Sequence, residues 1–223
     1  MALIGFFDIL GTKDAVMNDQ FGDLVALDFV GHVGFAAKHF PSLRFAVFSD
    51  SVIVSANEDD DSSFLQAVQF MYGQWYADFI FVRGGIADGE IRWVDYKIVD
   101  EMFNALPNLM YARVYGKGLV IANELEQRSG PGAITFLTES AANRLSIASP
   151  NSVMLGTTPM LCWASEREAT MLVGYSKINL KHKPNQGAGR RHALATLYYW
   201  EQVVLQKKFL PDFSNFHDKQ TRT

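Results

Sequence analysis

Residues 2–11 have the sequence ALIGFFDILG, an apolar run that holds one carboxylate, Asp8, and ends at Gly11. A short apolar run ended by a glycine predicts a strand that is buried on both faces. Burying a carboxylate in such a strand costs on the order of several kcal/mol unless a partner compensates it. Asp8 is therefore a candidate functional residue, although an aspartate just ahead of Gly11 and Thr12 also suits a turn or a helix cap.

The following residues extend this strand into a definite order of elements. Apolar spacing and turn residues predict a helix over 14–40, strands over 44–48 and 52–56, a helix over 62–78, and a strand over 79–87 that extends through 90–94. The order β-α-β-β-α-β is that of the ferredoxin-like split βαβ sheet. We therefore predict an α+β fold with helices packed on the sheet.

Beyond residue 100 the patterns predict a C-terminal extension that is β-rich and helical. Its expected elements are a helix over 111–128, a strand over 134–137, a helix over 138–145 capped by Thr138, a β-leaning region over 153–180 and a helix over 190–209. We expect a single domain over residues 1–209, followed by a polar tail over 210–223.

The composition argues against several classes of function. The chain has 223 residues, 48% of them hydrophobic, and a formal net charge of −4, which suits one soluble globular domain and argues against a nucleic-acid partner. No apolar stretch approaches the roughly 20 residues of a membrane span, and the N-terminus lacks the basic residues of a signal peptide. We therefore expect a cytoplasmic protein with no membrane partner. Its single cysteine, Cys162, is expected to be a buried thiol.

Asp50 is the second candidate carboxylate. It lies in the Ser49-Asp50-Ser51 link between two β-rich runs, where aspartate is common for turn geometry alone. In a split βαβ sheet, however, the first and third strands are neighbours, so Asp8 and Asp50 are expected to meet at one edge. Two converging carboxylates favour a site for Mg²⁺ or Mn²⁺, which take oxygen ligands together with substrate phosphates.

Five segments resemble the catalytic domain of class III nucleotidyl cyclases in order and spacing. They are the metal motif at 6–11 (FFDILG), the turn at 48–52 (FSDSV), the strand at 83–89 (RGGIADG), the helix at 115–126 (YGKGLVIANELE) and a late strand at 178–181 (INLK). The resemblance runs from Ala2 to about Lys181. No single segment is specific, so the identification depends on their combined order.

The resemblance implies a homodimer with composite active sites that bind a nucleoside triphosphate and close it into a cyclic monophosphate. Asp8, Asp50 and the backbone carbonyl of Ile9 would bind two Mn²⁺ or Mg²⁺ ions. One protomer would supply these ligands, and the other would supply groups that read the base and bind phosphate. The implied nucleotide contacts are Phe6, Gly11, Thr12, Ala46, Arg113 and Lys181.

The helix at 115–126 departs from the family at the two positions that hold an asparagine and an arginine for the transition state. Val120 and Glu124 occupy these positions. The cations that stand nearest as substitutes are Lys117, Arg113, Arg128 and Arg83. We predict Lys117 and Arg113 as the catalytic cations, although each also fits a solvated surface charge. Without a replacement, the domain would bind nucleotide without turnover.

The positions that read adenine in adenylate cyclases also differ. Where those enzymes have a lysine and an aspartate, this sequence has Ala46 and Arg113. An arginine only donates hydrogen bonds, so it suits a carbonyl edge of uracil, cytosine or guanine rather than the amine of adenine. The sequence is most similar to the pyrimidine cyclases of the bacterial Pycsar antiphage system, which make cyclic UMP or cyclic CMP. The donor-only edge favours UTP over CTP. A cytidylate or guanylate cyclase, or a catalytically silent domain that senses nucleotide or binds a partner, stays open as an alternative.

Overall fold

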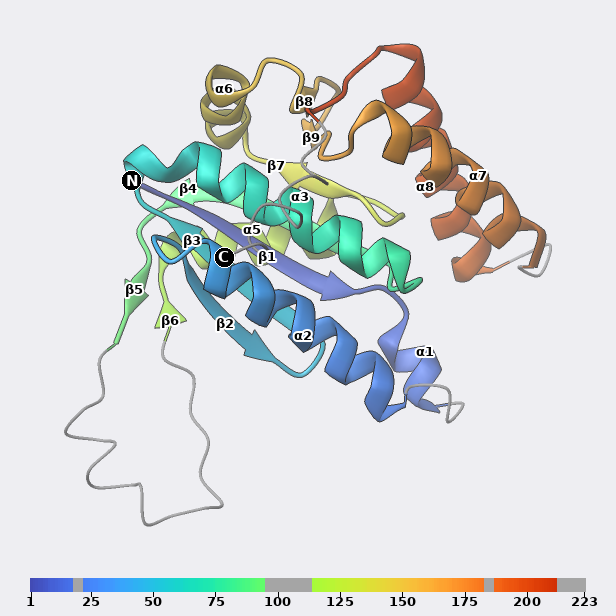
Figure 1. Cartoon of the computed structure of the whole chain (residues 1–223), viewed down its shortest axis with the longest axis horizontal. Coiled ribbons are helices and arrows are strands. Elements are labelled where there is room, and N and C mark those ends of the chain that lie inside the picture. The colour runs from blue at the N-terminus through green and yellow to red at the C-terminus, as the bar shows by residue number, and fades with distance from the viewer. Residues whose placement is uncertain (18–21, 95–113, 183–186, 212–223) are drawn as a thin grey trace, which may run out of the picture.

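The structure, a computed structural model, describes residues 1–17, 22–94, 114–182 and 187–211. Its strands are β1 (Ala2–Ile9), β2 (Arg44–Phe48), β3 (Ser51–Ala56), β4 (Val82–Gly89), β5 (Arg92–Trp93), β6 (Val114–Tyr115), β7 (Thr135–Leu137), β8 (Val153–Met154) and β9 (Met160–Leu161). Its helices are α1 (Thr12–Met17), α2 (Asp23–His39), α3 (Asp61–Ala77), α5 (Lys117–Arg128), α6 (Glu139–Ala148), α7 (Glu166–His182) and α8 (Ala188–Leu205), with a 3₁₀ turn at Glu58–Asp60. Figure 1 shows these elements arranged around a twisted sheet.

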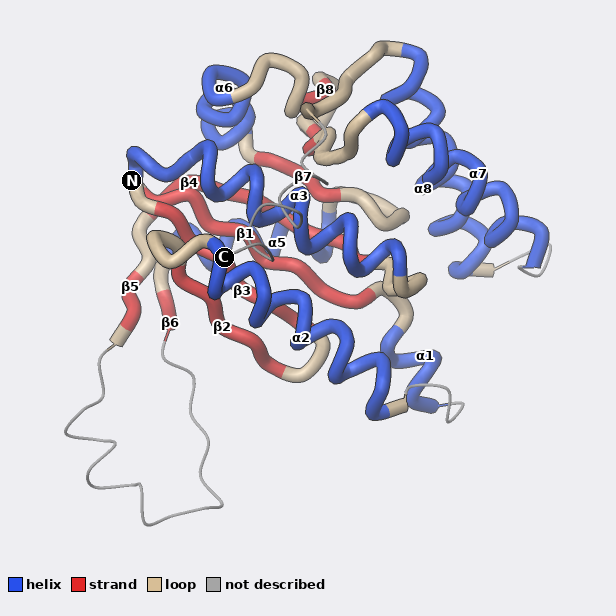
Figure 2. Tube along the Cα trace, viewed as in Figure 1, coloured by secondary structure: helices blue, strands red, loops and turns tan. Residues whose placement is uncertain are grey.

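Seven strands form one sheet in the order β2-β3-β1-β4-β7-β9-β8 (Figure 2). β1 pairs antiparallel with β3 on one side and with β4 on the other, whereas β4 and β7 are parallel. The order β2-β3-β1-β4 confirms the predicted split βαβ arrangement and the α+β class. β5 and β6 form a separate two-stranded ribbon, so the strand expected to continue to residue 94 is two strands.

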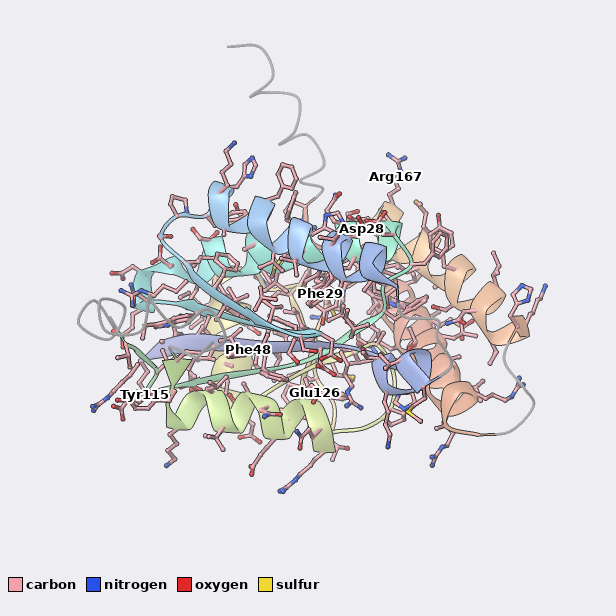
Figure 3. The ribbon with its side chains drawn as sticks, turned by 90° about the horizontal axis from the view of Figure 1, so that it is seen from below. Asp28, Phe29, Phe48, Tyr115, Glu126 and Arg167 are labelled. Carbon is pink, nitrogen blue, oxygen red and sulfur yellow. The ribbon has the colours of Figure 1, made fainter. Side chains whose placement is uncertain are left out.

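The two faces of the sheet have different coverings because successive side chains of β1 alternate between them. Phe7 points into the larger core, on the face covered by α2 and α3. There Phe29 of α2 stacks on Trp75 of α3 with ring centroids 4.9 Å apart. Phe6 belongs to the opposite face, where α5 packs, and Asp8 follows it on that face. Figure 3 shows α5 on one side of the sheet and α2 on the other.

Glycines in β4 let α5 approach the sheet closely. A side chain at Gly85 would place its Cβ 2.8 Å from Cβ of Leu125 and 2.9 Å from the backbone nitrogen of Glu126. A Cβ at Gly89 would lie 2.8 Å from Cα of Gly118. The glycines of the RGGIADG segment are therefore required by packing, and they allow the last turn of α5 to lie close against β4.

The C-terminal extension packs on the core through aromatic rings. Trp163 stacks on Tyr72 of α3 at 5.0 Å, and Trp200 of α8 meets Trp163 edge-on, also at 5.0 Å. Cys162 is fully buried, as predicted. Leu210 is buried as well, so packing continues one residue past the expected boundary at 209, and residues 212–223 of the expected tail lie outside the described residues.

The β-leaning region predicted over 153–180 is wrong over most of its length. The short strands β8 and β9 form at its start, but Glu166–His182 is helix α7. Reciprocal capping starts this helix. The backbone N–H of Ser165 donates to the Glu168 carboxylate at 2.8 Å, and the N–H of Glu168 donates to the Ser165 hydroxyl at 3.3 Å. The segment 178–181, which the cyclase resemblance assigned to a strand, is therefore helical.

Two helices have other bounds in the structure than those predicted from the sequence. The helix expected over 14–40 is divided into α1 and α2, with residues 18–21 between them outside the described part. The helix expected over 111–128 begins only at Lys117, after strand β6 and Gly116. The φ of Gly116 is 155°, close to the limit of the region that favours glycine. A Cβ at this position would collide with the backbone of Glu90 and Ile91, which follow β4.

Candidate active site

The end of β1 and the turn between β2 and β3 meet at one edge of the sheet, as predicted. Asp8 pairs in register with Ser51 of β3, and the backbone N–H of Ile9 donates to the carbonyl of Asp50 at 3.0 Å. Ser49 has a φ of 50°, a left-handed conformation that turns the chain and returns Asp50 to the side of β1. Asp8 and Asp50 are both half-buried, so a ligand can reach them from solvent.

The Asp8 carboxylate lacks full compensation for its burial. Its pKa is raised from 3.8 to about 6. Burial is the largest cause, and the carboxylates of Asp50 and Glu126 also raise the pKa. The Ser51 hydroxyl, which donates a hydrogen bond to Asp8, and the charge of Arg83 lower it. A carboxylate in this state favours the approach of a cation.

Glu126 is a third carboxylate at this edge, more deeply buried than Asp8 and Asp50, and the sequence analysis did not single it out. It lies on the last turn of α5, between that helix and the sheet (Figure 3), and is only 3% exposed. Its Oε1 accepts a hydrogen bond from Nε of Arg83 at 2.6 Å, within an ion pair. The two residues are 43 positions apart, so no local pattern joins them. The available signal was Gly85, which allows α5 to pack this closely.

The donor set fits hard divalent cations. Within the described residues, no group of three or more His, Cys, Asp or Glu side chains is placed to hold a metal ion. Two carboxylates nevertheless suffice for Mg²⁺ or Mn²⁺, which complete their coordination with waters and substrate phosphates. The observation that supports the fit is the raised pKa of Asp8, since a bound cation would supply the missing compensation. The Ile9 carbonyl accepts a hydrogen bond from the Thr12 hydroxyl at 3.0 Å, which orients it.

Asp8→Asn is expected to stabilise the metal-free protein at neutral pH. Because the pKa of Asp8 is higher in the folded state, this group lowers the free energy of unfolding as the pH rises from about 4 to about 6, and the loss persists above that range. Asparagine does not ionise and so removes this loss of stability. The variant should therefore have a higher Tm than wild type near pH 7.5 and about the same Tm near pH 4. Calorimetry in the presence of a chelator measures both values. A variant less stable than wild type near pH 7.5 would contradict the raised pKa.

The predicted nucleotide contacts in the N-terminal half share one region of the structure. Phe6 and Ala46 are half-buried and, together with Phe48, lie on the sheet face that carries Asp8. Gly11 has a φ of 89°, and no atom lies within 4 Å of the position that its Cβ would take. A ligand can therefore approach the backbone at the end of β1.

The structure describes two of the predicted cations, Lys117 and Lys181. Lys117 is exposed on the first turn of α5, and the next residue, Gly118, packs against Gly89 at the far end of β4. Lys181 is exposed on α7, so the strand context that suggested its phosphate contact is wrong. Arg113 lies outside the described residues.

A cavity of about 620 Å³ opens at the end of β1 that is opposite Asp8. Its lining includes Arg44, Ser55 and Trp93. The indole N–H of Trp93 donates to the Ser55 hydroxyl at 2.9 Å, which fixes the ring. Arg44 precedes Ala46 by two positions on β2, so both side chains belong to the same face of the strand. The volume suits a small organic ligand, and sequence reasoning missed both Arg44 and Trp93.

The fold of the chain is similar to that of solved cyclase structures. The chain matches a monomeric double mutant of the guanylyl cyclase domain of the RhoGC fusion protein from the aquatic fungus Blastocladiella emersonii, with a TM-score of 0.51 and 11% identity over 73% of this chain and 94% of that chain. This chain has the fold of a nucleotidyl cyclase domain. The cyclase fold expected from the sequence is thereby confirmed.

Further cyclases show weaker similarity to the chain. The guanylyl cyclase Cya2 has a TM-score of 0.48 and 11% identity over 72% of this chain and 89% of that chain. The adenylyl cyclase CyaB from P. aeruginosa has a TM-score of 0.45 and 13% identity over 71% of this chain and 90% of that chain. No protein-family model and no curated protein matches the sequence. Among the helices that the structure describes, none combines the length and the apolar character needed to cross a membrane.

Proposed function

We propose that this chain is a metal-dependent nucleotidyl cyclase that converts a pyrimidine nucleoside triphosphate, with UTP favoured, to its 3′,5′-cyclic monophosphate and pyrophosphate. The observation that carries the proposal is the meeting of Asp8 and Asp50 at an accessible edge of a sheet with the cyclase fold. The raised pKa of Asp8 supports it, because a protein with no use for a cation gains nothing from converging carboxylates there. By the Pycsar resemblance, the proposed setting is antiphage defence.

The residues at this edge have separate parts in the proposed reaction. Asp8, Asp50 and the Ile9 carbonyl would hold two Mn²⁺ or Mg²⁺ ions, which when bound supply the positive charge that acidifies the ribose 3′-hydroxyl and stabilises the phosphates. The Ser51 hydroxyl orients the Asp8 carboxylate, and the Thr12 hydroxyl orients the Ile9 carbonyl. These two hydrogen bonds hold both proposed oxygen ligands in position.

A second copy of the chain completes the proposed site. Lys117 and the cavity at Arg44 lie toward the start of β1, whereas Asp8 lies at its end, six residues further on and roughly 20 Å away at the usual rise of a strand. In a two-fold dimer, Lys117, Arg113 and Lys181 of one protomer would serve the aspartates of the other, as the class III resemblance implies. Lys117 is proposed as the transition-state cation and Lys181 as a phosphate contact.

The proposed base-reading surface is the face of β2 together with Arg113. Ala46 is a small residue on that face, and Arg44, which lines the cavity, adds a guanidinium two positions earlier. The ring of Trp93 lies at the same cavity and offers a surface on which a planar base can stack. Guanidinium groups donate hydrogen bonds and accept none, so the surface suits the carbonyl groups of uracil.

UTP is expected to be the best substrate and ATP a poor one. A buried donor that meets the adenine amine instead of an acceptor costs about 1–3 kcal/mol, which corresponds to roughly ten- to a hundredfold in kcat/KM. Arg113→Ala should therefore flatten the preference among the four nucleotides more than it lowers the rate with UTP. Steady-state kinetics with each nucleotide measures this. Faster conversion of ATP than UTP, or an equal loss with all four nucleotides, would contradict the assignment.

A nucleotide-binding domain without turnover is the second candidate. The observation that favours it lies on α5, where Val120 is 58% exposed and Glu124 approaches Arg128 at 3.9 Å in a surface ion pair. Neither side chain can act as the asparagine or arginine that the cyclase resemblance expects. Binding of a nucleoside triphosphate without formation of a cyclic product would favour this second function. The steady-state kinetics with each of the four nucleotides also distinguishes among the uridylate, cytidylate and guanylate activities.

A further inference from the structure

Arg83 occupies the position from which an arginine would ordinarily pair with Asp8. The two residues are direct register partners on the adjacent strands β1 and β4. Side chains of directly opposed residues in an antiparallel pair share one face and lie about 5 Å apart at Cβ. A half-buried aspartate beside an arginine in this geometry would normally form an ion pair, because each charge compensates the other for lost hydration.

The structure has a different pairing. Arg83 donates from Nε to Oε1 of Glu126 at 2.6 Å, and a terminal guanidinium nitrogen contacts the same oxygen. Among the ion pairs of the described residues, Glu126 is the partner of Arg83, while Asp8 accepts a hydrogen bond from the Ser51 hydroxyl. The ion pair of Arg83 is therefore with a carboxylate of α5, while its charge still lowers the pKa of Asp8 from nearby.

Glu126 is well placed to retain the arginine. Its side chain is buried between α5 and the sheet, so an unpaired carboxylate there would be costly and the bond to Arg83 is strongly favoured. Gly85 removes the Cβ that would otherwise lie 2.9 Å from the backbone nitrogen of Glu126, which lets the helix come this close. The packing of α5 thus determines which carboxylate Arg83 contacts.

We propose that Glu126 is a positioning residue that draws Arg83 away from Asp8 and so keeps the Asp8 carboxylate open to a divalent cation. The inference rests on the proposed function only in that Asp8 is taken as a metal ligand. It assigns Glu126 no contact with the substrate. It also gives Arg83 a structural part, in place of the transition-state part for which it was a sequence candidate.

The test uses Mn²⁺ binding to the full chain without nucleotide, followed by the EPR signal of free Mn²⁺. In Glu126→Gln the arginine loses its charged partner and is expected to turn to Asp8, so Mn²⁺ affinity should fall about tenfold, the usual worth of a charge-assisted hydrogen bond. The double variant Arg83→Gln with Glu126→Gln removes the competing arginine and should restore the affinity to within about twofold of wild type. Glu124→Gln, an exposed carboxylate on the same helix, is the matched control and should change little.

A weaker affinity for Mn²⁺ in Glu126→Gln could come from a new contact between Arg83 and Asp8 or only from the loss of a nearby negative charge. A crystal structure of the metal-free variant distinguishes the two causes. The expected result is an ion pair between Arg83 and Asp8, within about 4 Å. The proposal is overturned if Arg83 stays away from Asp8 in that structure, if the single variant binds Mn²⁺ as wild type does, or if wild type binds no Mn²⁺.

A second comparison covers loss of folding in the single variant. If Glu126→Gln does not fold, the double variant Arg83→Gln with Glu126→Gln, which has no unpaired charge at these two positions, is compared directly with wild type for its Mn²⁺ affinity. Mn²⁺ affinity near the wild-type value is expected, and a tenfold loss in this folded protein overturns the proposal. Mn²⁺ binding by a wild-type protein that makes no cyclic nucleotide would defeat the proposed function but leave this inference standing.

Discussion

Asp50→Asn and Asp8→Asn are each expected to lower cyclase activity about a thousandfold or more while the protein stays folded. Each change replaces a charged oxygen by a neutral amide in the proposed metal site, for which we propose two carboxylates and a backbone carbonyl as protein ligands. The remaining carboxylate cannot hold both cations against the repulsion between them. The loss should therefore appear in kcat with the best substrate, measured as cyclic nucleotide formed under saturating Mn²⁺.

Asp28→Asn is the matched control for these two variants. Asp28 is exposed on α2, on the opposite side of the sheet from α5 (Figure 3), so its replacement should leave the activity within about twofold of wild type. The two-metal assignment is wrong if either site variant keeps more than about a tenth of the wild-type rate. It is also wrong if the Asp28 variant loses activity to the same degree, because the effect would then be a general one of charge.

Gly85→Ala is expected to produce the largest loss of stability among single glycine substitutions in β4. Its new Cβ would lie 2.8 Å from Cβ of Leu125 and 2.9 Å from the backbone nitrogen of Glu126, and a helix backbone cannot yield as a flexible side chain can. Overpacking of this kind costs about 3 kcal/mol, or roughly 6–12 °C in Tm for a chain of this length. Because α5 would shift, activity should fall with stability. Thermal unfolding followed by circular dichroism measures the first effect.

Gly174→Ala provides the control for Gly85→Ala. Gly174 is an exposed position of helix α7 with no atom within 4 Å of its expected Cβ, so alanine should raise stability there by up to about 1 kcal/mol through helix propensity. If Tm falls in Gly85→Ala and rises in Gly174→Ala, then close packing at Gly85, and not the loss of a glycine as such, determines the change in stability. An unchanged Tm for Gly85→Ala would contradict the tight contact between α5 and β4.

The elements in the first half of the chain could be predicted from the sequence because the signals there are local. The run at 2–8, the hairpin around Asp50 and the helix over 62–78 each carry their own periodicity and turn residues, and all three appear in the structure close to the predicted bounds. The edge at which Asp8 and Asp50 meet then follows from the order of the elements alone. Helix α6 was predicted for the same reason, since the Thr138 hydroxyl accepts from the Ala141 N–H at 3.2 Å.

Other features depended on contacts that no local pattern reports. Helix α7 was mistaken for β-leaning sequence because its apolar residues are β-branched or aromatic in part, and the reciprocal cap between Ser165 and Glu168 was the signal that periodicity overlooked. The burial of Glu126 depends on a helix that packs against glycines in another strand. The cavity beside Trp93 depends on where β2, β3 and β5 come together.

Incubation of the purified protein with each of the four nucleoside triphosphates and Mn²⁺, followed by mass spectrometry of the products, decides whether this chain is a nucleotidyl cyclase. We expect a 3′,5′-cyclic monophosphate and pyrophosphate in equal amounts, with UTP converted fastest and with no product from the Asp50→Asn protein. A wild-type protein that forms no cyclic nucleotide from any of the four, or that only hydrolyses them to diphosphates, would contradict the assignment of this chain as a nucleotidyl cyclase.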